Sequence, residues 1–281
     1  MTCSHFSKNG TILPLDKAVI PLQSIEYTYG FGVYETIRVL NGVPYFLKDH
    51  CERLIASAKI IELEHVFTAP FIEEAIVDLV ATLGKSATCN LKVLLVGAPT
   101  KEDAQLFILP LAPLFPDKKL YRDGVRTLVA SYERLYPQAK TLNMLVSYLL
   151  YRKARREGCY DALLMNRDGC ITEGTRTNFF AIRDKTLFTS PDEMVLAGVT
   201  RKTVLRVARQ SGFSIEERAL DLSEIKRCAG AFVTGTSIGI MPVKTIDDFS
   251  FTEIPPTLRE LMAQYDAFKK TCHGVMPKEY E

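Results

Sequence analysis

The chain has 281 residues, of which 47% are hydrophobic and 24% charged, with a formal net charge of +2. This is an ordinary globular composition, and the length allows two modest domains. So small a charge, without a basic cluster interleaved with aromatic residues, argues against binding to nucleic acid or to an anionic membrane.

The seven cysteines and four histidines are scattered along the chain, and no cysteines form a C-x-x-C pair. This pattern is typical of reduced thiols rather than of a disulfide framework or a zinc site. No secretory signal is visible, and no apolar run approaches the ~20 residues that a membrane span needs. We therefore expect a cytoplasmic, metal-free protein that does not enter a membrane.

The first part of the chain predicts mixed α/β structure. Residues 33–40 read as a strand, and Asn41-Gly42 is a strong signal for a hairpin turn into a second strand over 43–47. Asp49, three residues before Glu52, predicts a capping box at the start of a helix.

A second helix is predicted to begin at Pro70 and to end before Gly84, and buried strands are predicted over 91–96 and 106–111. Residues 113–123 contain two prolines and a run of charges, which disfavour a continuous helix or strand and favour a linker. We expect a small N-terminal domain over 1–112 and a larger C-terminal domain over 124–281.

The second part begins with a predicted strand over 125–132. An amphipathic helix follows, with Leu142, Leu145, Val146 and Leu149 at helical spacing. Further elements are a helix starting near Thr200 and several short strands, predicted over 161–165, 170–172, 178–182 and 231–234.

Four places combine small and polar residues in a way that favours chemistry. Glu173-Gly174 follows a strand, and Gly198-Val199-Thr200 opens a helix whose amide groups suit an anion. Gly235-Thr236-Ser237 follows another strand, and Lys140 precedes an apolar helix. Taken singly, each also fits an ordinary turn, helix cap or solvated lysine.

Five segments resemble, in order, the conserved segments of fold-type IV pyridoxal 5'-phosphate (PLP) enzymes. They are YGFGVYETIRVLNG, HCERLIASA, the stretch from Lys140 to the E-G-x-x-x-N signature at Glu173 and Asn178, AGVTRKTV and FVTGTSIGIMPV. This family contains branched-chain and D-amino-acid transaminases and aminodeoxychorismate lyase. The resemblance implies a two-domain α/β fold with the cofactor in the interdomain cleft, and a homodimer.

The resemblance also implies roles for the cofactor residues. Lys140 would form the Schiff base with PLP and carry the proton during catalysis, and Glu173 would face the pyridine nitrogen. Arg53 would bind the phosphate, and Asn178 would stabilise the loop that carries Glu173. The remaining phosphate contacts would come from Val199, Thr200, Gly235 and Thr236.

The substrate side is implied by fewer matches. Tyr34 corresponds to a position that lines the substrate pocket in the family. Arg176 and Lys92 are cations that could pair with a substrate carboxylate, although each also fits a solvated position. Ser237 is a further candidate.

The chain lacks one mark of each named subgroup: Leu145 stands where branched-chain enzymes often have tyrosine. The stretch Val96-Gly97-Ala98 lacks the arginine and histidine of D-amino-acid enzymes, and Met144 replaces the arginine common in the lyases. We therefore expect a ping-pong transaminase that uses a 2-oxo acid and either a D-amino acid or a branched-chain L-amino acid, with Arg176 favouring a charged or D-configured one. The alternatives are an aminodeoxychorismate lyase that releases pyruvate, and a PLP-binding relative without activity.

Overall fold

The computed structural model describes residues 4–20, 22–113 and 115–271, which divide into two compact units. The first unit contains the described residues up to 113 together with Ala139–Asn143. The second contains Phe115–Gln138 and Met144–Thr271. This division differs from the expected one, because the short segment around Lys140 packs with the first unit.

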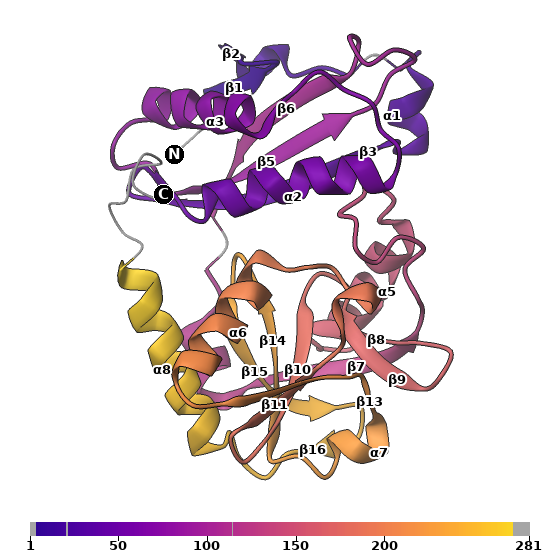
Figure 1. Ribbon diagram of the computed structural model, residues 1–281, viewed down its shortest axis with the longest axis vertical. Coiled ribbons are helices and arrows are strands. Elements are labelled where there is room, and N and C mark those ends of the chain that lie inside the picture. Colours follow the sequence, from indigo (N-terminus) through magenta and orange to yellow (C-terminus); the bar gives the residue numbers. More distant parts are fainter. Residues whose placement is uncertain (1–3, 21, 114, 272–281) are drawn as a thin grey trace. The chain divides into compact units, whose positions relative to one another are not determined.

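The first unit is built on a six-stranded antiparallel sheet in the order β2-β1-β6-β5-β3-β4. Its strands are β1 His5–Lys8, β2 Thr11–Pro14, β3 Gly32–Leu40, β4 Val43–Pro44, β5 Cys89–Val96 and β6 Gln105–Leu111. The helices of this unit are η1 Leu15–Lys17, α1 Ile25–Tyr29, α2 Leu47–Ile60 and α3 Ala69–Leu83 (Figure 1).

Helices α2 and α3 pack on one face of this sheet. Alternate residues of β3 and β5, such as Val33, Ile37, Leu91 and Val93, join the apolar core beneath these helices. Because strand side chains alternate between faces, Tyr34 and its neighbours at even positions lie on the opposite face.

The predicted hairpin forms, since Asn41 and Gly42 both have positive φ, as a tight two-residue turn requires. The predicted second strand is too long, because β4 ends at Pro44. The predicted capping box at Asp49 is wrong. Helix α2 begins at Leu47 with Phe46 as its N-cap, so Asp49 lies inside the first turn.

In the second unit, six strands close into a ring in which successive members pair, from β10 through β14, β15, β7, β8 and β9 and back to β10. These strands are β7 Val125–Ser131, β8 Asp161–Met165, β9 Cys170–Gly174, β10 Asn178–Arg183, β14 Gly230–Gly235 and β15 Gly239–Ile246. The ring closes at one pair, Glu173 opposite Asn178. The outer strands are β11 Thr186–Thr189, β12 Ser214–Glu217, β13 Leu220–Asp221 and β16 Phe249–Ser250.

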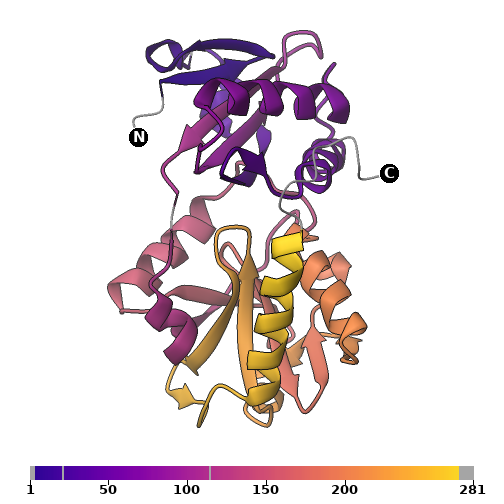
Figure 2. The same cartoon turned by 90° about the vertical axis from the view of Figure 1, so that its left-hand side faces the viewer.

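The helices of the second unit are α4 Lys118–Asp123, α5 Leu145–Arg156, η2 Asp192–Met194, α6 Val199–Gln210, α7 Leu222–Ile225 and α8 Pro256–Thr271. Helices α6 and α8 cover Phe180 and Ile182 of β10, and α8 runs beside β15 (Figure 2). Helix α4 lies within the predicted linker, where Asp117 caps it by accepting from the amide of Lys119.

Helix α5 spans Leu145–Arg156, so Leu142 of the predicted apolar period lies before the helix, and the apolar side of α5 is not in the core. Leu145, Val146 and Leu149 are exposed by 67%, 40% and 51%, whereas Ser147 and Ala154 are buried. The apolar spacing therefore marks a surface that the single chain leaves uncovered. Among the described residues, no helix combines the length and apolarity that crossing a membrane demands.

Candidate active site

Lys140 lies on a strand-like segment that extends the sheet of the first unit. The amide of Tyr34 donates to the Lys140 carbonyl at 2.8 Å, and Leu142 donates to Gly32 at 2.8 Å. A side chain at Gly32 would lie 2.7 Å from Leu142 and 2.8 Å from the Leu95 carbonyl, so only glycine permits this close approach. The Lys140 amide also donates to the Ser57 hydroxyl at 3.1 Å, which ties the segment to α2.

Two amines face the ring of Tyr34. The Nζ atom of Lys140 lies 4.6 Å from the ring centroid, and that of Lys92 lies 3.5 Å from it. Burial lowers the pKa of Lys92, and Lys140 adds to this, while Tyr34 opposes it. Lys92 is therefore half-buried beside Lys140 and does not point from a strand edge into solvent.

Arg53 lies on α2 beside an acid that the sequence does not single out. Its Nε and Nη2 atoms donate to the two carboxylate oxygens of Glu35 at 2.6 and 2.8 Å. His50 contacts the same carboxylate through Nδ1 at 2.8 Å. The H-x-x-R spacing could have drawn attention to His50, whereas nothing in the strand pattern marks Glu35.

In the second unit, Glu173 is a buried carboxylate at the end of β9, only 2% exposed. Its Oε1 lies 2.8 Å from Nε of Arg134, and its Oε2 accepts from the amide of Leu196 at 3.3 Å. Arg134 also donates to the carbonyl of Thr175 at 2.7 Å, so it holds both the acid and the loop that follows. Sequence reasoning missed Arg134, which lies in an irregular segment remote in sequence from Glu173.

Asn178 connects the Glu173 region to the start of α6. Its Nδ2 donates to the carbonyl of Leu196 at 2.8 Å, while Glu173 binds the amide of the same residue. A Cβ on Gly198, the N-cap of α6, would lie 2.0 Å from Oδ1 of Asn178. Glycine at this position therefore lets Asn178 approach the helix end closely.

The helix end carries two further predicted residues. Val199 and Thr200 form the first turn of α6, where amide groups have no partner within the helix and the dipole favours an anion. Asn178 pairs with Thr234 on β14, directly before Gly235. The turn with Gly235, Thr236 and Ser237 thus begins beside Asn178, as does α6.

Arg176 lies in the loop between Glu173 and Asn178 and is exposed. Its guanidinium lies 4.0 Å from the ring centroid of Tyr151. The two flanking threonines point the other way, since the hydroxyls of Thr175 and Thr177 donate to the buried carboxylate of Asp161. This alternation directs the Arg176 side chain away from Asp161.

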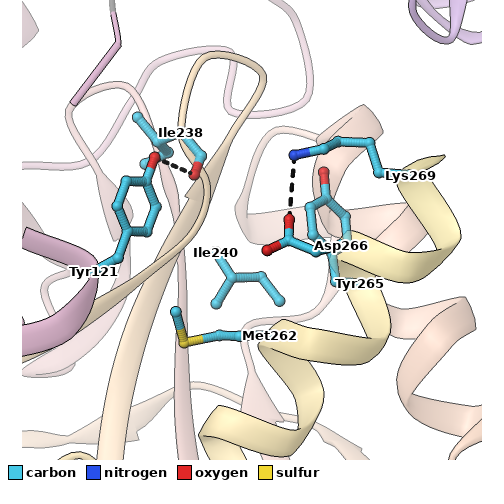
Figure 3. A pocket seen from close by; sticks show the side chains of 7 residues that line it. All are labelled: Tyr121, Ile238, Ile240, Met262, Tyr265, Asp266 and Lys269. Atoms are coloured by element: carbon cyan, nitrogen blue, oxygen red, sulfur yellow. Dashed lines mark hydrogen bonds and ion pairs between the residues drawn. The ribbon is translucent and has the colours of Figure 1, made fainter. Parts of the chain in front are cut away.

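A pocket of about 210 Å³ lies between α4, β15 and α8 (Figure 3). Ile238, Ile240 and Tyr265 line it, and the hydroxyl of Tyr121 donates to the carbonyl of Ile238 at 2.9 Å. None of the predicted site residues lines it. Ile238 follows Ser237, so Tyr121 steadies this turn from a neighbouring helix.

Known proteins resemble this chain over most of its length. The sequence model of the amino-transferase class IV family matches residues 32–246. A D-alanine aminotransferase of Bacillus licheniformis is 29% identical over 247 residues, covering 85% of this chain and 87% of the relative. A putative branched-chain-amino-acid aminotransferase of Methanocaldococcus jannaschii is 31% identical over 258 residues, covering 85% and 86%.

Solved structures are similar over nearly the whole chain. The branched-chain aminotransferase of Thermoproteus uzoniensis with norvaline has a TM-score of 0.86 at 27% identity, covering 96% of both chains. The PLP-form of the Thermobaculum terrenum enzyme has a TM-score of 0.85 at 26% identity, covering 96% of this chain and 94% of that one.

The fold and the matched span define a class IV enzyme of mixed α/β structure. The chain belongs to the class IV aminotransferase family, as the resemblance implied. It is an aminotransferase similar both to enzymes named for D-alanine and to enzymes named for branched-chain amino acids.

Proposed function

We propose that the protein is a PLP-dependent transaminase that moves an amino group between an amino acid and a 2-oxo acid by a ping-pong mechanism. The observation that carries this proposal is the environment of Glu173. Its buried carboxylate is held by Arg134 and by the Leu196 amide. Its partner across the strand pair, Asn178, lies beside the start of α6, where free amides suit an anion. A carboxylate suits a protonated ring nitrogen, and helix amides suit a phosphate. PLP carries both of these groups on one molecule.

The residues fit PLP in three respects. Lys140 offers an amine for its aldehyde, and Glu173 offers an acceptor for its protonated ring nitrogen. Val199 and Thr200 offer amides at the start of α6, and a Cβ on Gly198 would collide with Asn178. Gly235 and Thr236, with Arg53 from the first unit, are proposed to complete the phosphate contacts.

When bound, PLP supplies an electron-accepting ring that stabilises a substrate carbanion. Lys140 would hold the cofactor through its amine and would carry the proton between the substrate Cα and the cofactor C4′. Glu173 keeps the ring nitrogen protonated, and Arg134 and the Leu196 amide fix its carboxylate. Asn178 holds Leu196 from the other side, which supports a structural role for Asn178.

For the substrate we propose a D-amino acid or a branched-chain L-amino acid. The Nζ atoms of Lys92 and Lys140 lie 3.5 and 4.6 Å from the centroid of the Tyr34 ring. A half-buried ammonium of this kind suits a substrate carboxylate. Arg176, seated on Tyr151, and Ser237 are proposed as further contacts.

We further propose that the enzyme is a homodimer. Leu145, Val146 and Leu149 on α5 are exposed, as is Leu135 at 74%. The three exposed apolar side chains on α5 lie within about one turn of the same helix, and such a surface favours a protein partner. The oligomeric state measured by light scattering, before and after replacing Leu145 and Leu149 with glutamate, tests this assignment.

The function itself is tested by half-reactions. Purified protein loaded with PLP is mixed separately with D-alanine, L-alanine, D-leucine, L-leucine and 2-oxoglutarate, and the visible absorbance of the bound cofactor is followed. We expect one enantiomeric series to convert the cofactor and 2-oxoglutarate to reverse the change. If no amino donor changes the absorbance of the bound cofactor, the transaminase proposal is overturned. Release of pyruvate from aminodeoxychorismate would indicate the lyase.

Lys140→Ala should lower turnover on the order of 10³-fold or more, because the proton carrier is lost. It should also abolish the covalent attachment of PLP, seen as a missing adduct after borohydride reduction and mass spectrometry. Lys101→Ala, at an exposed lysine, is the matched control. Full turnover by the Lys140 variant would contradict the assigned role.

A further inference from the structure

Three charged or polar side chains of the first unit form a closed group beneath α2. Glu35 on β3 is 1% exposed, His50 is fully buried, and the Arg53 side chain is 11% exposed. The carboxylate of Glu35 receives Nε and Nη2 of Arg53 at 2.6 and 2.8 Å and Nδ1 of His50 at 2.8 Å. The amide of Thr36 adds a contact at 3.2 Å.

The chemistry of these groups fixes their protonation. An ionised carboxylate only accepts hydrogen bonds, so Nδ1 of His50 must carry the proton that it shares with Glu35. Burial alone would raise the pKa of Glu35, but Arg53 and His50 together hold the pKa far below its usual range. Burial lowers the pKa of His50, against the opposing effect of Glu35. The group is therefore a neutral histidine, a carboxylate and a guanidinium.

The geometry of the Arg53 contact is specific. A guanidinium that binds a carboxylate through Nε and Nη2 is held by two parallel hydrogen bonds, which fix its plane and its rotation. The Nη1 side then points away from Glu35. The long, flexible side chain of Arg53 thus has a single orientation before any ligand binds. This reduces the conformational entropy that is lost on binding.

We propose that Glu35 and His50 are positioning residues that aim the Nη1 side of Arg53 at the phosphate of the cofactor. Glu35 holds the guanidinium, and His50 holds Glu35. This inference rests on the proposed role of Arg53 as a phosphate ligand. It assigns a function to two buried residues that touch neither the substrate nor the reacting atoms.

The test compares PLP with pyridoxal, which carries the same aldehyde and ring but no phosphate. Apo-protein is titrated with each compound, and dissociation constants are taken from the absorbance of the bound form. Glu35→Gln should weaken PLP binding about 10- to 100-fold, because a charge-assisted pair that orients Arg53 is lost. Pyridoxal binding should stay unchanged. Glu52→Gln, the same chemical change at an exposed position of α2, is the matched control.

A double-mutant cycle separates positioning from a general effect on the fold. Glu35→Gln combined with Arg53→Met should bind PLP no more weakly than Arg53→Met alone. Equal weakening of PLP and pyridoxal, or full additivity with Arg53→Met, would overturn the inference. If Arg53→Met leaves PLP binding intact, the proposed role of Arg53 fails first, and the inference fails with it.

His50 supplies an independent check. His50→Asn retains an N–H donor near the position of Nδ1 and should restore most of the PLP affinity that His50→Leu loses. Equal affinity in the two variants would remove His50 from the proposal. If Glu35→Gln does not fold, Glu35→Asp replaces it, since the shorter carboxylate keeps the charge and loses the two-point contact.

Discussion

Two buried carboxylates, Glu35 in the first unit and Asp161 in the second, have surroundings that differ in kind. Glu35 in the first unit binds the Arg53 guanidinium and the His50 ring, and its pKa lies far below the usual range although burial alone would raise it. Within the described part of the chain, Asp161 in the second unit accepts from the hydroxyls of Thr175 and Thr177 and from the Ala162 amide. Burial raises the pKa of Asp161, and the two hydroxyls, the charge of Arg176 and the Ala162 amide offset this rise incompletely.

The difference indicates what each carboxylate is built to hold. A buried carboxylate with a cation partner stabilises a charged side chain in one orientation, here that of Arg53. A buried carboxylate with hydroxyl partners fixes the backbone that carries those hydroxyls, here the loop from Glu173 to Asn178. Glu173 in the second unit resembles Glu35 in this respect, because a guanidinium, that of Arg134, lies 2.8 Å from its carboxylate.

Removing the charge of Glu35 should have the largest effect. Glu35→Gln leaves Arg53 without its carboxylate and should lower the free energy of unfolding by about 3–5 kcal/mol, as for other broken buried ion pairs. Urea unfolding followed by circular dichroism measures this change. Glu52→Gln should stay within about 0.5 kcal/mol of the parent. Similar losses in both variants would contradict the assigned contrast.

Removing one hydroxyl partner of Asp161 should have an intermediate effect. Thr177→Val keeps the side-chain volume and deletes a 2.8 Å hydrogen bond to the carboxylate. The expected loss is about 2 kcal/mol, typical of a hydrogen bond to a charged group. Thr82→Val is the control, because its exposed hydroxyl only bonds a carbonyl of its own helix. The same unfolding experiment compares the two.

Removing the charge of Asp161 should have the smallest effect at neutral pH. Asp161→Asn loses a poorly compensated buried charge and keeps the volume, so the free energy of unfolding should change by no more than about 1 kcal/mol. This contrasts with Glu35→Gln. A loss equal to that of Glu35→Gln would show that Asp161 has an effective cation partner.

The same variant predicts a pH dependence with a definite sign. Since the pKa of Asp161 is raised from 3.8, the folded protein binds this proton more tightly than the unfolded chain does. Its contribution to stability therefore falls as the pH rises above 3.8 through the raised pKa. Melting temperatures between pH 4 and 7 should favour Asp161→Asn over the parent increasingly as the pH rises. A difference that shrinks with pH would reverse the sign assigned to Asp161.

Local patterns predicted much of the fold. Asn41-Gly42 predicted the hairpin after β3, and the apolar period beginning at Pro70 predicted α3, which Thr68 caps by accepting from the Phe71 amide. Helix α6 begins at Val199, close to the predicted start near Thr200. This start was predictable because Gly198, the N-cap, is a signal in the local sequence.

Contacts between distant segments were not predictable in this way. The bridge between Val33 and Thr141 places Lys140 in the first unit, and no short-range pattern encodes such pairing. Arg134 reaches Glu173 from an irregular segment. The exposed apolar side of α5 has the same period as a core-facing helix, so the sequence cannot distinguish a core from a partner surface. Glu35 follows Tyr34 in a strand where an acid normally reads as solvated.

The assignment of Ala139–Asn143 to the first unit has a mechanical consequence. Chain on both sides of this segment, Phe115–Gln138 and Met144–Thr271, belongs to the second unit. Lys140 therefore lies on a short segment that belongs to the first unit, and the chain at both ends of this segment belongs to the second unit. Both ends of this segment are therefore continuous with the chain of the second unit, while its backbone bonds Gly32 and Tyr34 in the sheet of the first.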